Sequence, residues 1–430
     1  MKKFMLKTMG CKSNQLEGSL IEENLIKVGF EKVDKVADAN IFILNSCTVT
    51  HKSDNEAFSI LNKAKHDNPE VKTILTGCIA QIEKENLLQN PNIDLVLGND
   101  EKLKISSFID FSEKCFTEDI MDLDTFHDVF LENTKKTRAS LKIQDGCDNR
   151  CSYCIIPFAR GKNRSANADF ILEQIKIYEN MGFNEIVLTG IHIGQWGIDF
   201  SDRKNLLHLL ENIESKTNIA RFRLGSLNPL EINDEMLNFL KNSEKFCPHF
   251  HLSLQSMCDK TLKSMNRHYS VNQSLELIEK ISGSFNLPFI GSDVIAGFSG
   301  ESEEDFNTTV ENLNKSKLTQ IHTFPYSVRK NTAAESFDNP VDLKTKNKRA
   351  SIIKQISAQK HAEFLQNNVS SIQEVLIEKN VDKATGLLKG VTRNYINVLI
   401  EQSEDFSEIK NTLQKVSITN IEEKVFARIV

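Results

Sequence analysis

Short apolar segments alternate with segments of helical periodicity through most of this chain of 430 residues. Apolar segments bounded by turn residues are typical of strands buried on both faces of a parallel sheet. The alternation therefore predicts an α/β fold. In such folds the carboxyl ends of the strands share one edge of the sheet, and ligands bind at that edge. The residues that end each apolar segment are thus the first candidates for function.

The first 112 residues contain three of these apolar segments, and each of the three ends in a cysteine. The cysteines are Cys11, Cys47 and Cys78. We expect a parallel α/β domain over residues 1–112, in which the three thiols converge at one edge of the sheet. Buried structural thiols are the alternative, because free cysteine packs well in a core.

The alternation resumes after a connector at residues 113–136. Six apolar segments follow within residues 137–366, and they read SLKIQD, EIVLTG, RFRLGS, FHLSLQ, FIGSDVIAG and IHTFPYS. Six strands in βα order predict a barrel or an incomplete barrel, with its chemistry at the carboxyl ends of the strands. Candidate cofactor contacts at these ends are Thr189, Gly190, Ser226, Gln255 and Asp293. An ordinary turn residue is the alternative at each position.

The pattern changes to alternating β segments with turn signals from residue 367 onward. It predicts a small all-β domain over residues 367–430, a five-stranded barrel of the kind that binds oligonucleotides. Alternation would place Lys389, Arg393 and Tyr395 on one strand face, where two cations and a ring could meet phosphates and stack on a base. A solvated strand with Tyr395 in the barrel core is the alternative.

Charge and hydropathy narrow the class of protein. The formal net charge of −6 does not by itself indicate a nucleic-acid partner, but Lys344–Lys360 holds six Lys/Arg and no acid. That segment is either a solvated helix face or a basic surface. No apolar run approaches the ~18–20 residues of a membrane span, and the N-terminus lacks the apolar region of a signal peptide. We therefore expect a cytoplasmic protein without a membrane partner.

The nine cysteines point to metal or redox chemistry, because disulfides do not persist in a reducing compartment. Cys147, Cys151 and Cys154 form a Cys-x3-Cys-x2-Cys triplet on one short loop. Three thiolates can bind three irons of a [4Fe–4S] cluster and leave the fourth iron open to another ligand. A zinc knuckle is the alternative, although zinc sites normally use four ligands spaced as pairs. The remaining cysteines are interpreted as inert thiols: Cys115, Cys247 and Cys258.

The triplet, with Tyr153 before its last cysteine, resembles the signature of the radical S-adenosylmethionine superfamily. The resemblance implies that Tyr153 packs near the adenine and that the open iron binds the amino and carboxylate groups of S-adenosylmethionine. Reduction then cleaves the sulfonium to a 5′-deoxyadenosyl radical, so a reducing electron-donor protein is an implied partner. The cofactor carries the difficult chemistry and the protein positions it.

The segments TMGCKSNQLEG, LNSCTVT and TGCIAQ, around Cys11, Cys47 and Cys78, resemble the N-terminal cluster domain of the methylthiotransferase family. The resemblance implies a second [4Fe–4S] cluster on these three cysteines, involved in sulfur transfer. It extends over nearly the whole chain, through YCIIPFARGKNRS, EIVLTGIHIGQWG and DVIAGFSGESEEDF. The C-terminal domain resembles the TRAM domain, which grips tRNA in that family.

Within that family, GCKSNQ, NSCTVT and ARGKNRS are most similar to the branch acting on N6-threonylcarbamoyladenosine at tRNA position 37. The resemblance implies an enzyme, expected to be a monomer, that adds a methylthio group to C2 of that base in tRNA. Arg160 and Arg164 are then expected to contact a tRNA phosphate or the threonylcarbamoyl carboxylate, with surface solvation as the alternative. Three other functions stay open: action on isopentenyladenosine tRNA, action on a ribosomal protein side chain, and a non-catalytic RNA-binding iron–sulfur sensor.

Two segments depart from the family pattern. Met257-Cys258 follows HLSLQS where the family has Gly-Ser, and Gly225–Pro229 stands where it has Ser-Ser-Ile-Glu-Pro. Met257 is the sharper departure, because a bulky side chain replaces a position that tolerates positive φ. Both segments lie at strand ends, so they put the cofactor contacts there in question.

Overall fold

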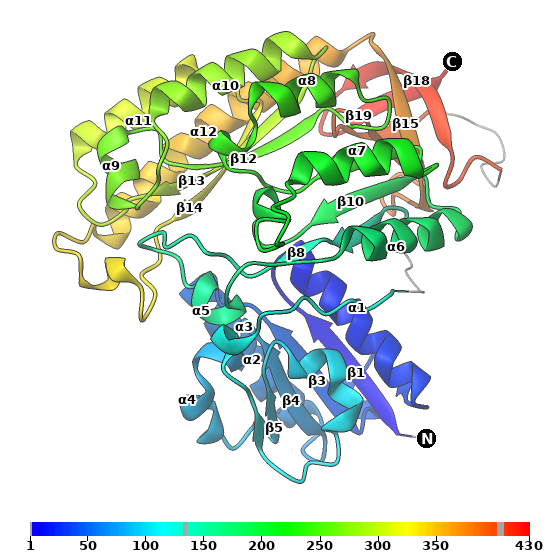
Figure 1. The fold of residues 1–430 in the computed structure, drawn as a ribbon, viewed down its shortest axis with the longest axis vertical. Coiled ribbons are helices and arrows are strands. Elements are labelled where there is room, and N and C mark those ends of the chain that lie inside the picture. Colours follow the sequence, from blue (N-terminus) through cyan, green and yellow to red (C-terminus); the bar gives the residue numbers. More distant parts are fainter. Residues whose placement is uncertain (1, 132–135, 402–407) are drawn as a thin grey trace.

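An all-parallel sheet forms the N-terminal part of the protein (Figure 1). The computed structural model describes residues 2–131, 136–401 and 408–430, so part of the expected connector lies outside the described residues. The strand order is β2-β1-β3-β4-β5-β6. The strands are β1 (Lys3–Thr8), β2 (Glu31–Lys32), β3 (Ile41–Ser46), β4 (Lys72–Gly77), β5 (Leu95–Leu97) and β6 (Cys115–Phe116). Because β6 belongs to this sheet, the sheet extends past residue 112.

Strand β3 shows why this sheet forms the centre of its domain. All six of its residues are buried, and neighbouring side chains enter different cores. Ile41 and Ile43 pack on the side of α1, whereas Phe42 and Leu44 pack on the side of α2, as the two-residue period of a strand requires. The helices of this domain are α1 (Lys12–Lys27), α2 (His51–Asp67), α3 (Cys78–Ile82) and α4 (Lys84–Leu88).

The central part of the chain forms an incomplete barrel of six parallel strands. β7, β10 and β11 make one sheet, β12, β13 and β14 make another, and isolated bridges join β11 to the β12 region. Within the described residues, β7 and β14 share no sheet, so the barrel is open between them. The strands are β7 (Ala139–Lys142), β10 (Glu185–Thr189), β11 (Arg221–Leu224), β12 (His249–Gln255), β13 (Phe289–Ala296) and β14 (Gln320–Pro325). The expectation of six βα-ordered strands is confirmed.

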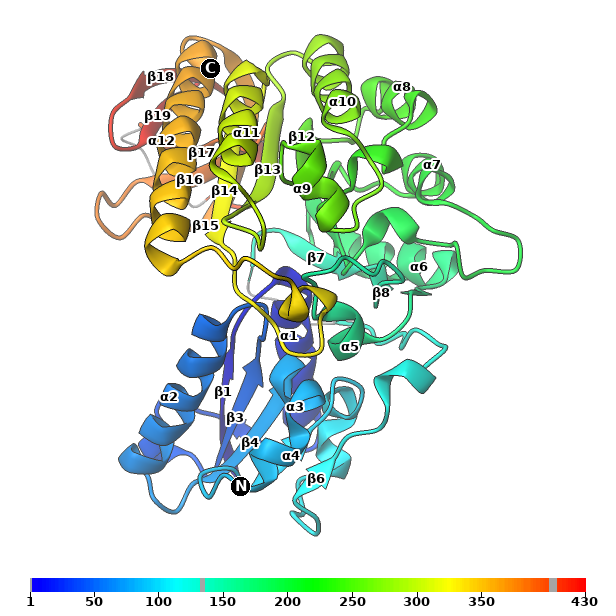
Figure 2. The same cartoon turned by 90° about the vertical axis from the view of Figure 1, so that its left-hand side faces the viewer.

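Helices cover the outer face of this barrel (Figure 2). They are α6 (Ala168–Asn180), α7 (Leu206–Lys216), α8 (Asp234–Asn242), α9 (Asp259–Ser264), α10 (Val271–Ser284), α11 (Glu303–Lys315) and α12 (Leu343–Asn368), whereas α5 (Ile156–Arg160) lies against α3 of the N-terminal domain. Many of these helices begin at an N-cap residue whose side chain accepts a hydrogen bond from a backbone N–H, which is a strong helix-start signal in a sequence. These N-cap residues are Asn167, Asn205, Asn233, Ser270, Ser302 and Asp342. Among the described residues, no helix combines the length and the apolar character needed to cross a bilayer.

The N-terminal domain lies across the open side of the barrel and contacts both of its edges. Helix α1 packs against β7. On the opposite edge, Arg329, just after β14, donates hydrogen bonds to the Asp54 carboxylate at 2.7 Å and to Thr48 Oγ1 at 2.7 Å. Short segments complete the connections: β8 (Gln144–Asp145), β9 (Arg164–Ser165) and the 3₁₀ helices η1 (Val36–Asp38), η2 (Glu101–Ser107), η3 (Ile120–Asp122), η4 (Ile193–Gln195), η5 (Pro229–Glu231) and η6 (Ala333–Ser336).

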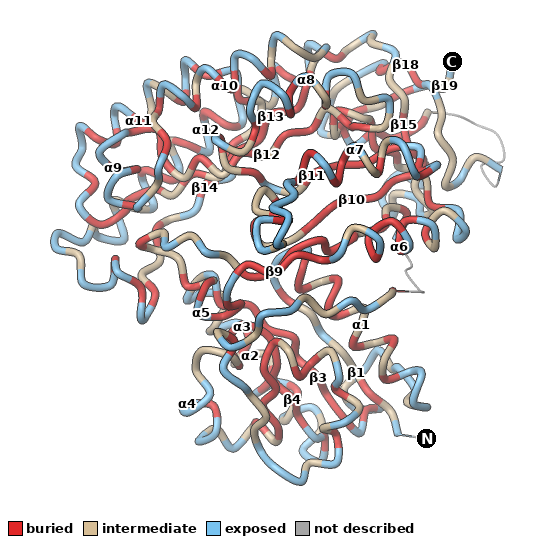
Figure 3. The backbone as a smooth tube through the Cα atoms, viewed as in Figure 1, coloured by how far each residue is buried: buried red, intermediate tan, exposed pale blue. Residues whose placement is uncertain are grey.

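The C-terminal part of the chain is a closed five-stranded barrel, as expected. Its strands are β15 (Ile372–Val381), β16 (Leu388–Thr392), β17 (Asn397–Ile400), β18 (Leu413–Ile421) and β19 (Val425–Ile429). Its core also takes in Phe289 of β13 and Phe364 of α12, so it is continuous with the central domain. Figure 3 shows that the residues of β11 and β12 are mostly buried.

A buried ion triad docks the C-terminal barrel onto the central one. Glu185 pairs with Arg221 at 2.6 Å and with Arg223 at 2.8 Å, and all three side chains are buried. Arg221 donates to the Val391 carbonyl at 2.9 Å and Arg223 to the Thr392 carbonyl at 2.6 Å. Two arginine side chains of the central barrel thus donate hydrogen bonds to backbone carbonyl groups at the end of β16.

The expectation that Lys389, Arg393 and Tyr395 share one strand face is wrong. Strand β16 ends at Thr392, because the chain turns there and Tyr395 adopts a left-handed φ of 70°. Arg393 donates to the carbonyls of Glu244 and Phe246 in the central domain. The ring of Tyr395 packs on His249 at 4.2 Å between ring centres. Arg393 and Tyr395 therefore dock the barrel, and Lys389 stays at the surface beside Glu378.

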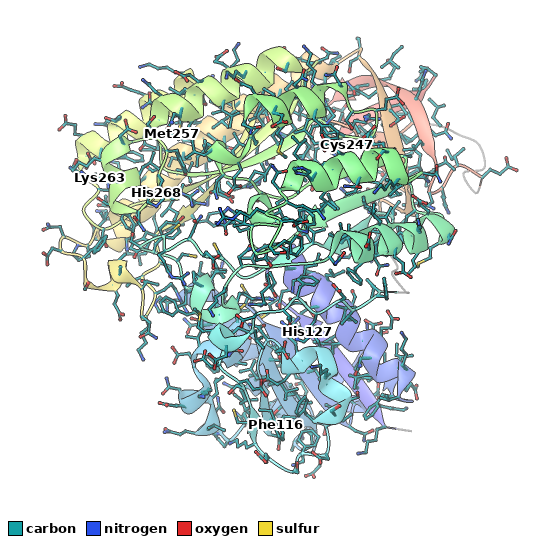
Figure 4. All side chains as sticks on the ribbon, in the orientation of Figure 1. Phe116, His127, Cys247, Met257, Lys263 and His268 are labelled. Carbon is teal, nitrogen blue, oxygen red and sulfur yellow. The ribbon has the colours of Figure 1, made fainter. Side chains whose placement is uncertain are left out.

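Both residues of the Met257-Cys258 departure are buried. Met257, labelled in Figure 4, is fully buried in the main core, and the positive φ in this region belongs to Gln255 instead. Cys258 begins α9 and is also buried. Cys247, labelled in the same figure, is fully buried too. These placements are consistent with inert thiols.

We predict that Glu185→Gln lowers the free energy of unfolding at pH 7 by about 3 kcal/mol, because two buried guanidinium groups lose their shared carboxylate. Urea unfolding of the full chain measures this change. Glu211→Gln, on the exposed face of α7, is the control and should stay within about 0.5 kcal/mol of wild type.

The effect should also depend on pH. Burial alone would raise the pKa of Glu185, but the charges of Arg223 and Arg221 outweigh burial and lower that pKa. A carboxyl with a lowered folded pKa stabilises the protein above its unfolded pKa, about 4.3 for Glu, and loses this contribution as the pH falls through the folded value. The difference between wild type and variant should therefore shrink below about pH 4. An undiminished difference there would contradict the argument.

Candidate functional site

The cysteine triplet lies on the loop after β8, at the carboxyl end of β7. The loop is held by hydrogen bonds from Cys147 N to the Gly161 carbonyl and from Cys154 N to the Cys151 carbonyl, each 3.0 Å long. Gly146 begins the loop with a φ of 70°, and a Cβ there would lie 1.7 Å from the Lys162 carbonyl oxygen. Only glycine fits this close approach of two backbone segments.

The three thiols lie within electrostatic range of one another. Burial, with smaller contributions from Cys151 and Cys147, raises the pKa of Cys154 to about 12. Without a metal such a thiol stays protonated, and metal binding displaces the proton. Cys151 and Cys154 also line a cavity of about 600 Å³. Thiols gathered on one loop beside a cavity fit three irons of a cluster whose fourth iron binds another ligand.

No three Cys, His, Asp or Glu side chains in the described ranges converge on a single metal-ion position. A [4Fe–4S] cluster makes no such demand, because each thiolate binds a different iron.

Polar side chains from the loops after β10 and β11 and from the segment after α9 lie beside the triplet. His192 Nδ1 lies 3.5 Å from Cys147 Sγ, and its Nε2 bonds to the Glu231 carboxylate. Arg267 Nη1 lies 3.4 Å from Cys151 Sγ, and its Nη2 donates to Asn228. Burial alone would lower the pKa of His192, but the bonds to Cys147 and Glu231 raise it to about 10. Two side chains, His192 and Arg267, thus lie within hydrogen-bonding distance of cysteines of the triplet.

Sequence reasoning did not identify His192, Glu231 or Arg267 as functional residues. Two of them follow strands that it did predict, since His192 comes after β10 and Glu231 after β11. Asn228, one of the family departures, bonds to all three side chains. The signal available in the sequence for His192 and Glu231 was therefore their position after strand ends, which many turn residues share; Arg267 follows α9 and had no such signal.

The candidate cofactor contacts have varied positions. Thr189 ends β10 and is buried, Gly190 lies against the Gln144 carbonyl, and Ser226 is exposed just beyond β11. Gln255 ends β12 with a φ of 62°. Asp293 lies inside β13 rather than at its end, and its carboxylate is 3.0 Å from His251 Nε2. Tyr153 meets the Phe298 ring edge-on at 6.3 Å between ring centres.

The second set of cysteines comes together at one edge of the N-terminal sheet. Cys11 precedes α1, Cys47 follows β3 and Cys78 begins α3, and the strands before them are neighbours in the sheet. A Cβ on Gly10 would lie 2.8 Å from Cys47 Sγ, so glycine lets the first two loops approach each other. Burial raises the pKa of Cys47 to about 11, and Cys78 and Cys11 add to the shift. The three thiols fit a second cluster.

Arg160 and Arg164, which were expected to contact tRNA or the threonylcarbamoyl carboxylate, make their hydrogen bonds inside the protein. Both side chains are buried. Arg160 donates to the two carboxylate oxygens of Glu17 at 2.5 and 3.0 Å. Arg164 donates to the carbonyls of Lys162 and Arg160. Their donors are used inside the protein because the N-terminal domain covers them, which the sequence pattern did not reveal.

Glu17 is the centre of a buried charge cluster between the N-terminal domain and the barrel. Besides Arg160, it pairs with Lys102 and Lys142, each at 2.6 Å. Lys142 also pairs with Asp145 at 2.6 Å. With Arg164, four cations face two carboxylates, an excess of two positive charges. Burial lowers the pKa of Lys102 despite the opposing charges of Glu17 and Cys78. Burial would also lower the pKa of Arg160, but the charges of Glu17 and Cys78 outweigh it and raise that pKa.

We predict that Glu17→Gln lowers the free energy of unfolding by about 3–5 kcal/mol, because it leaves buried cations without their central carboxylate. Denaturant unfolding of the full chain measures this. Glu22→Gln is the matched control on the same helix, since its ion pair with Lys32 is partly exposed and worth about 0–1 kcal/mol. Equal losses in the two variants would show that the cluster does not hold the domains together.

Two family models match the chain. The Radical SAM superfamily matches residues 141–313, which hold the triplet and most of the barrel. Uncharacterized protein family UPF0004 matches residues 3–98, which hold the second set of cysteines.

Curated relatives match nearly the full length. The chain is 34% identical to threonylcarbamoyladenosine tRNA methylthiotransferase MtaB of Aquifex aeolicus, over 96% of this chain and 100% of that protein. It is 31% identical to tRNA-2-methylthio-N(6)-dimethylallyladenosine synthase of Petrotoga mobilis, over 97% of each. Among solved structures, the radical S-adenosylmethionine methyltransferase TsrM of Kitasatospora setae is similar in fold, with a TM-score of 0.55 and 12% identity over 75% of this chain and 73% of that one.

Proposed function

The chain belongs to the radical S-adenosylmethionine methylthiotransferase family, and from this premise we propose that it adds a methylthio group to C2 of N6-threonylcarbamoyladenosine at position 37 of tRNA. Enzymes of this family use S-adenosylmethionine and [4Fe–4S] clusters. The observation that carries the proposal is the presence of two separate cysteine sets, one at the barrel mouth and one at the edge of the N-terminal sheet.

Each set of cysteines has its own role in this proposal. Cys147, Cys151 and Cys154 would hold the cluster that leaves one iron open for S-adenosylmethionine, and Cys11, Cys47 and Cys78 would hold a second cluster. When bound, these groups supply the methyl group, the sulfur and the radical chemistry at C2.

The residues around the cysteines position and stabilise them. His192 and Arg267 donate hydrogen bonds toward thiolates of the first set, which stabilises the charged sulfur. Glu17 fixes the N-terminal domain, and with it the second set, against the barrel.

The alternative substrate is dimethylallyladenosine in tRNA, because the Petrotoga relative of similar identity carries that activity in its name. The two substrates differ in charge, since the threonylcarbamoyl group carries a carboxylate and the dimethylallyl group is neutral. We further propose a monomeric cytoplasmic enzyme that receives electrons from a reducing donor protein.

Mass spectrometry of nucleosides tests this function. We predict that the reconstituted full chain forms methylthio product on tRNA carrying threonylcarbamoyladenosine, but little on tRNA carrying dimethylallyladenosine. Wild type should hold about eight irons and each triple Cys→Ala variant about four, because the sets lie on separate domains. The Cys11→Ala/Cys47→Ala/Cys78→Ala variant should still cleave S-adenosylmethionine without forming product. Product from that variant at wild-type level would remove the second set from the mechanism.

We also propose that the C-terminal barrel and α12 together bind tRNA. Helix α12 carries three exposed lysines that form no ion pair with any described residue: Lys344, Lys348 and Lys354. In contrast, Lys389 of the barrel pairs with Glu378 at 3.2 Å. Other cations of α12 serve packing, since Arg349 pairs with Glu301 at 2.7 Å. The exposed lysines are therefore the cations best placed to meet phosphates.

We predict that Lys344→Ala/Lys348→Ala/Lys354→Ala weakens tRNA binding and flattens its salt dependence, by up to about 0.9 in the log–log slope for each phosphate that is no longer neutralised. Fluorescence anisotropy at several salt concentrations measures both. Lys389→Ala should have a smaller effect, because this lysine already pairs with a carboxylate. An unchanged slope in the triple variant would place the RNA-binding surface elsewhere.

A further inference from the structure

A second cavity, of about 350 Å³, lies on the inner side of the barrel where the three domains meet. Lys12 reaches it from the start of α1, Arg138 from the start of β7, Arg223 from β11 and Tyr395 from the C-terminal barrel. Its volume is within the range of small-molecule sites, roughly 300–1,000 Å³. It shares no lining residue with the cavity beside Cys151 and Cys154.

The lining of this cavity is strongly positive. Four cations line it, Lys136 with the three named above, against the single carboxylate of Glu378. This positive charge shifts the pKa of two side chains that line the cavity, His249 and Tyr395. Burial lowers the pKa of His249, and the charges of Arg223 and Lys12 lower it further. Burial would raise the pKa of Tyr395, but Lys12 and Arg138 reverse that shift. The cavity therefore favours an anion.

The cations of this cavity differ in how many of their N–H donors already bond to other protein groups. Arg223 donates to Glu185 at 2.8 Å and to two carbonyls of the C-terminal barrel at 2.6 and 2.7 Å. Arg138 has two long ion pairs, 4.0 Å to Glu185 and 3.9 Å to Glu378, and its guanidinium carbon lies 5.8 Å from the centre of the Tyr395 ring. The Lys12 ammonium makes no hydrogen bond or ion pair with any residue that the structure describes. Lys12 and Arg138 thus retain donors for a ligand.

The position of Lys12 in its helix is unfavourable for stability. It is the first residue of α1, whose first turn holds no acidic residue. A cation at this end of a helix faces the positive end of the helix dipole, where carboxylates are preferred. An anionic ligand at this point would be stabilised by the lysine and by the helix together.

We propose that Lys12, with Arg138 beside it, binds the carboxylate of the threonylcarbamoyl group on the substrate adenosine. This inference rests on the proposed function, because the proposed substrate base carries a carboxylate on its threonylcarbamoyl group. Lys12 follows Cys11, so a carboxylate held here keeps the base next to the second set of cysteines. A dimethylallyl group has no charge to offer this cavity, so Lys12 also selects between the two candidate substrates.

S-adenosylmethionine also carries a carboxylate on a purine nucleoside, so the experiment must separate the two sources. The first arm measures binding of two anticodon stem–loop RNAs by the reconstituted full chain, one with threonylcarbamoyladenosine at position 37 and one with adenosine. The second arm measures binding of S-adenosylmethionine alone by equilibrium dialysis.

Lys12→Gln should weaken binding of the threonylcarbamoyl RNA at least about tenfold, as expected when one charge-assisted hydrogen bond is removed. It should leave the adenosine RNA within about twofold and the affinity for S-adenosylmethionine unchanged. Lys12→Arg should keep most of the affinity, since the charge remains. Lys241→Gln, an exposed lysine on α8, is the control for loss of surface charge and should bind both RNAs as wild type does.

Arg138→Gln provides a second variant outside the N-terminal domain, and it should show the same selective loss even if Lys12→Gln disturbs folding near Cys11. Iron content and unfolding midpoint verify that each variant is intact. Equal losses for both RNAs would make Lys12 a phosphate contact, and weaker S-adenosylmethionine binding would assign the carboxylate to that cofactor; either result overturns the inference. So does unchanged RNA binding in both variants.

Failure of this inference is distinguishable from failure of the proposed function. If wild type forms product on threonylcarbamoyl tRNA while Lys12→Gln and Arg138→Gln bind the RNA normally, only the carboxylate site is wrong. If wild type forms product on dimethylallyl tRNA instead, the proposed substrate is wrong, and the carboxylate site is overturned with it.

Discussion

The buried carboxylate of Glu17 connects the N-terminal sheet to the barrel, and the placement of the two cysteine sets depends on it. Lys102 comes from its own domain, whereas Lys142 and Arg160 come from the barrel. Ionised groups removed from water are stable only when such partners surround them, so the domains meet in one orientation. Arg329 and Asp54 make the matching contact at the other edge of the open barrel.

The C-terminal barrel completes the interior of the central one. Arg221 and Arg223 reach from β11 to carbonyls of the barrel, and Tyr395 packs its ring on His249. The C-terminal barrel therefore also contributes to a cavity inside the central domain. Its attachment depends on Glu185, because two guanidinium groups share that single buried carboxylate.

The distribution of charge differs from the overall composition. The chain has a formal net charge of −6, yet positive charge gathers at two places inside it. One is the cluster around Glu17, next to Cys78, and the other is the cavity lined by Lys12 and Arg138. Thiolates of an iron–sulfur cluster and a substrate carboxylate are both anionic, so each place is suited to stabilise negative charge that the polypeptide alone does not supply.

The sequence by itself determined the α/β class, the six central strands and the grouping of Cys11, Cys47 and Cys78. The reason is local, because the period of apolar residues identifies a strand and parallel strands bring their ends to one edge. Tertiary structure decided which charged side chains pair. Arg160 was expected at a substrate and is buried on Glu17, 143 positions away in the chain, and Tyr395 meets His249 rather than solvent. A charged or aromatic side chain has no periodic signal, so its partner depends on which distant segments the fold brings together.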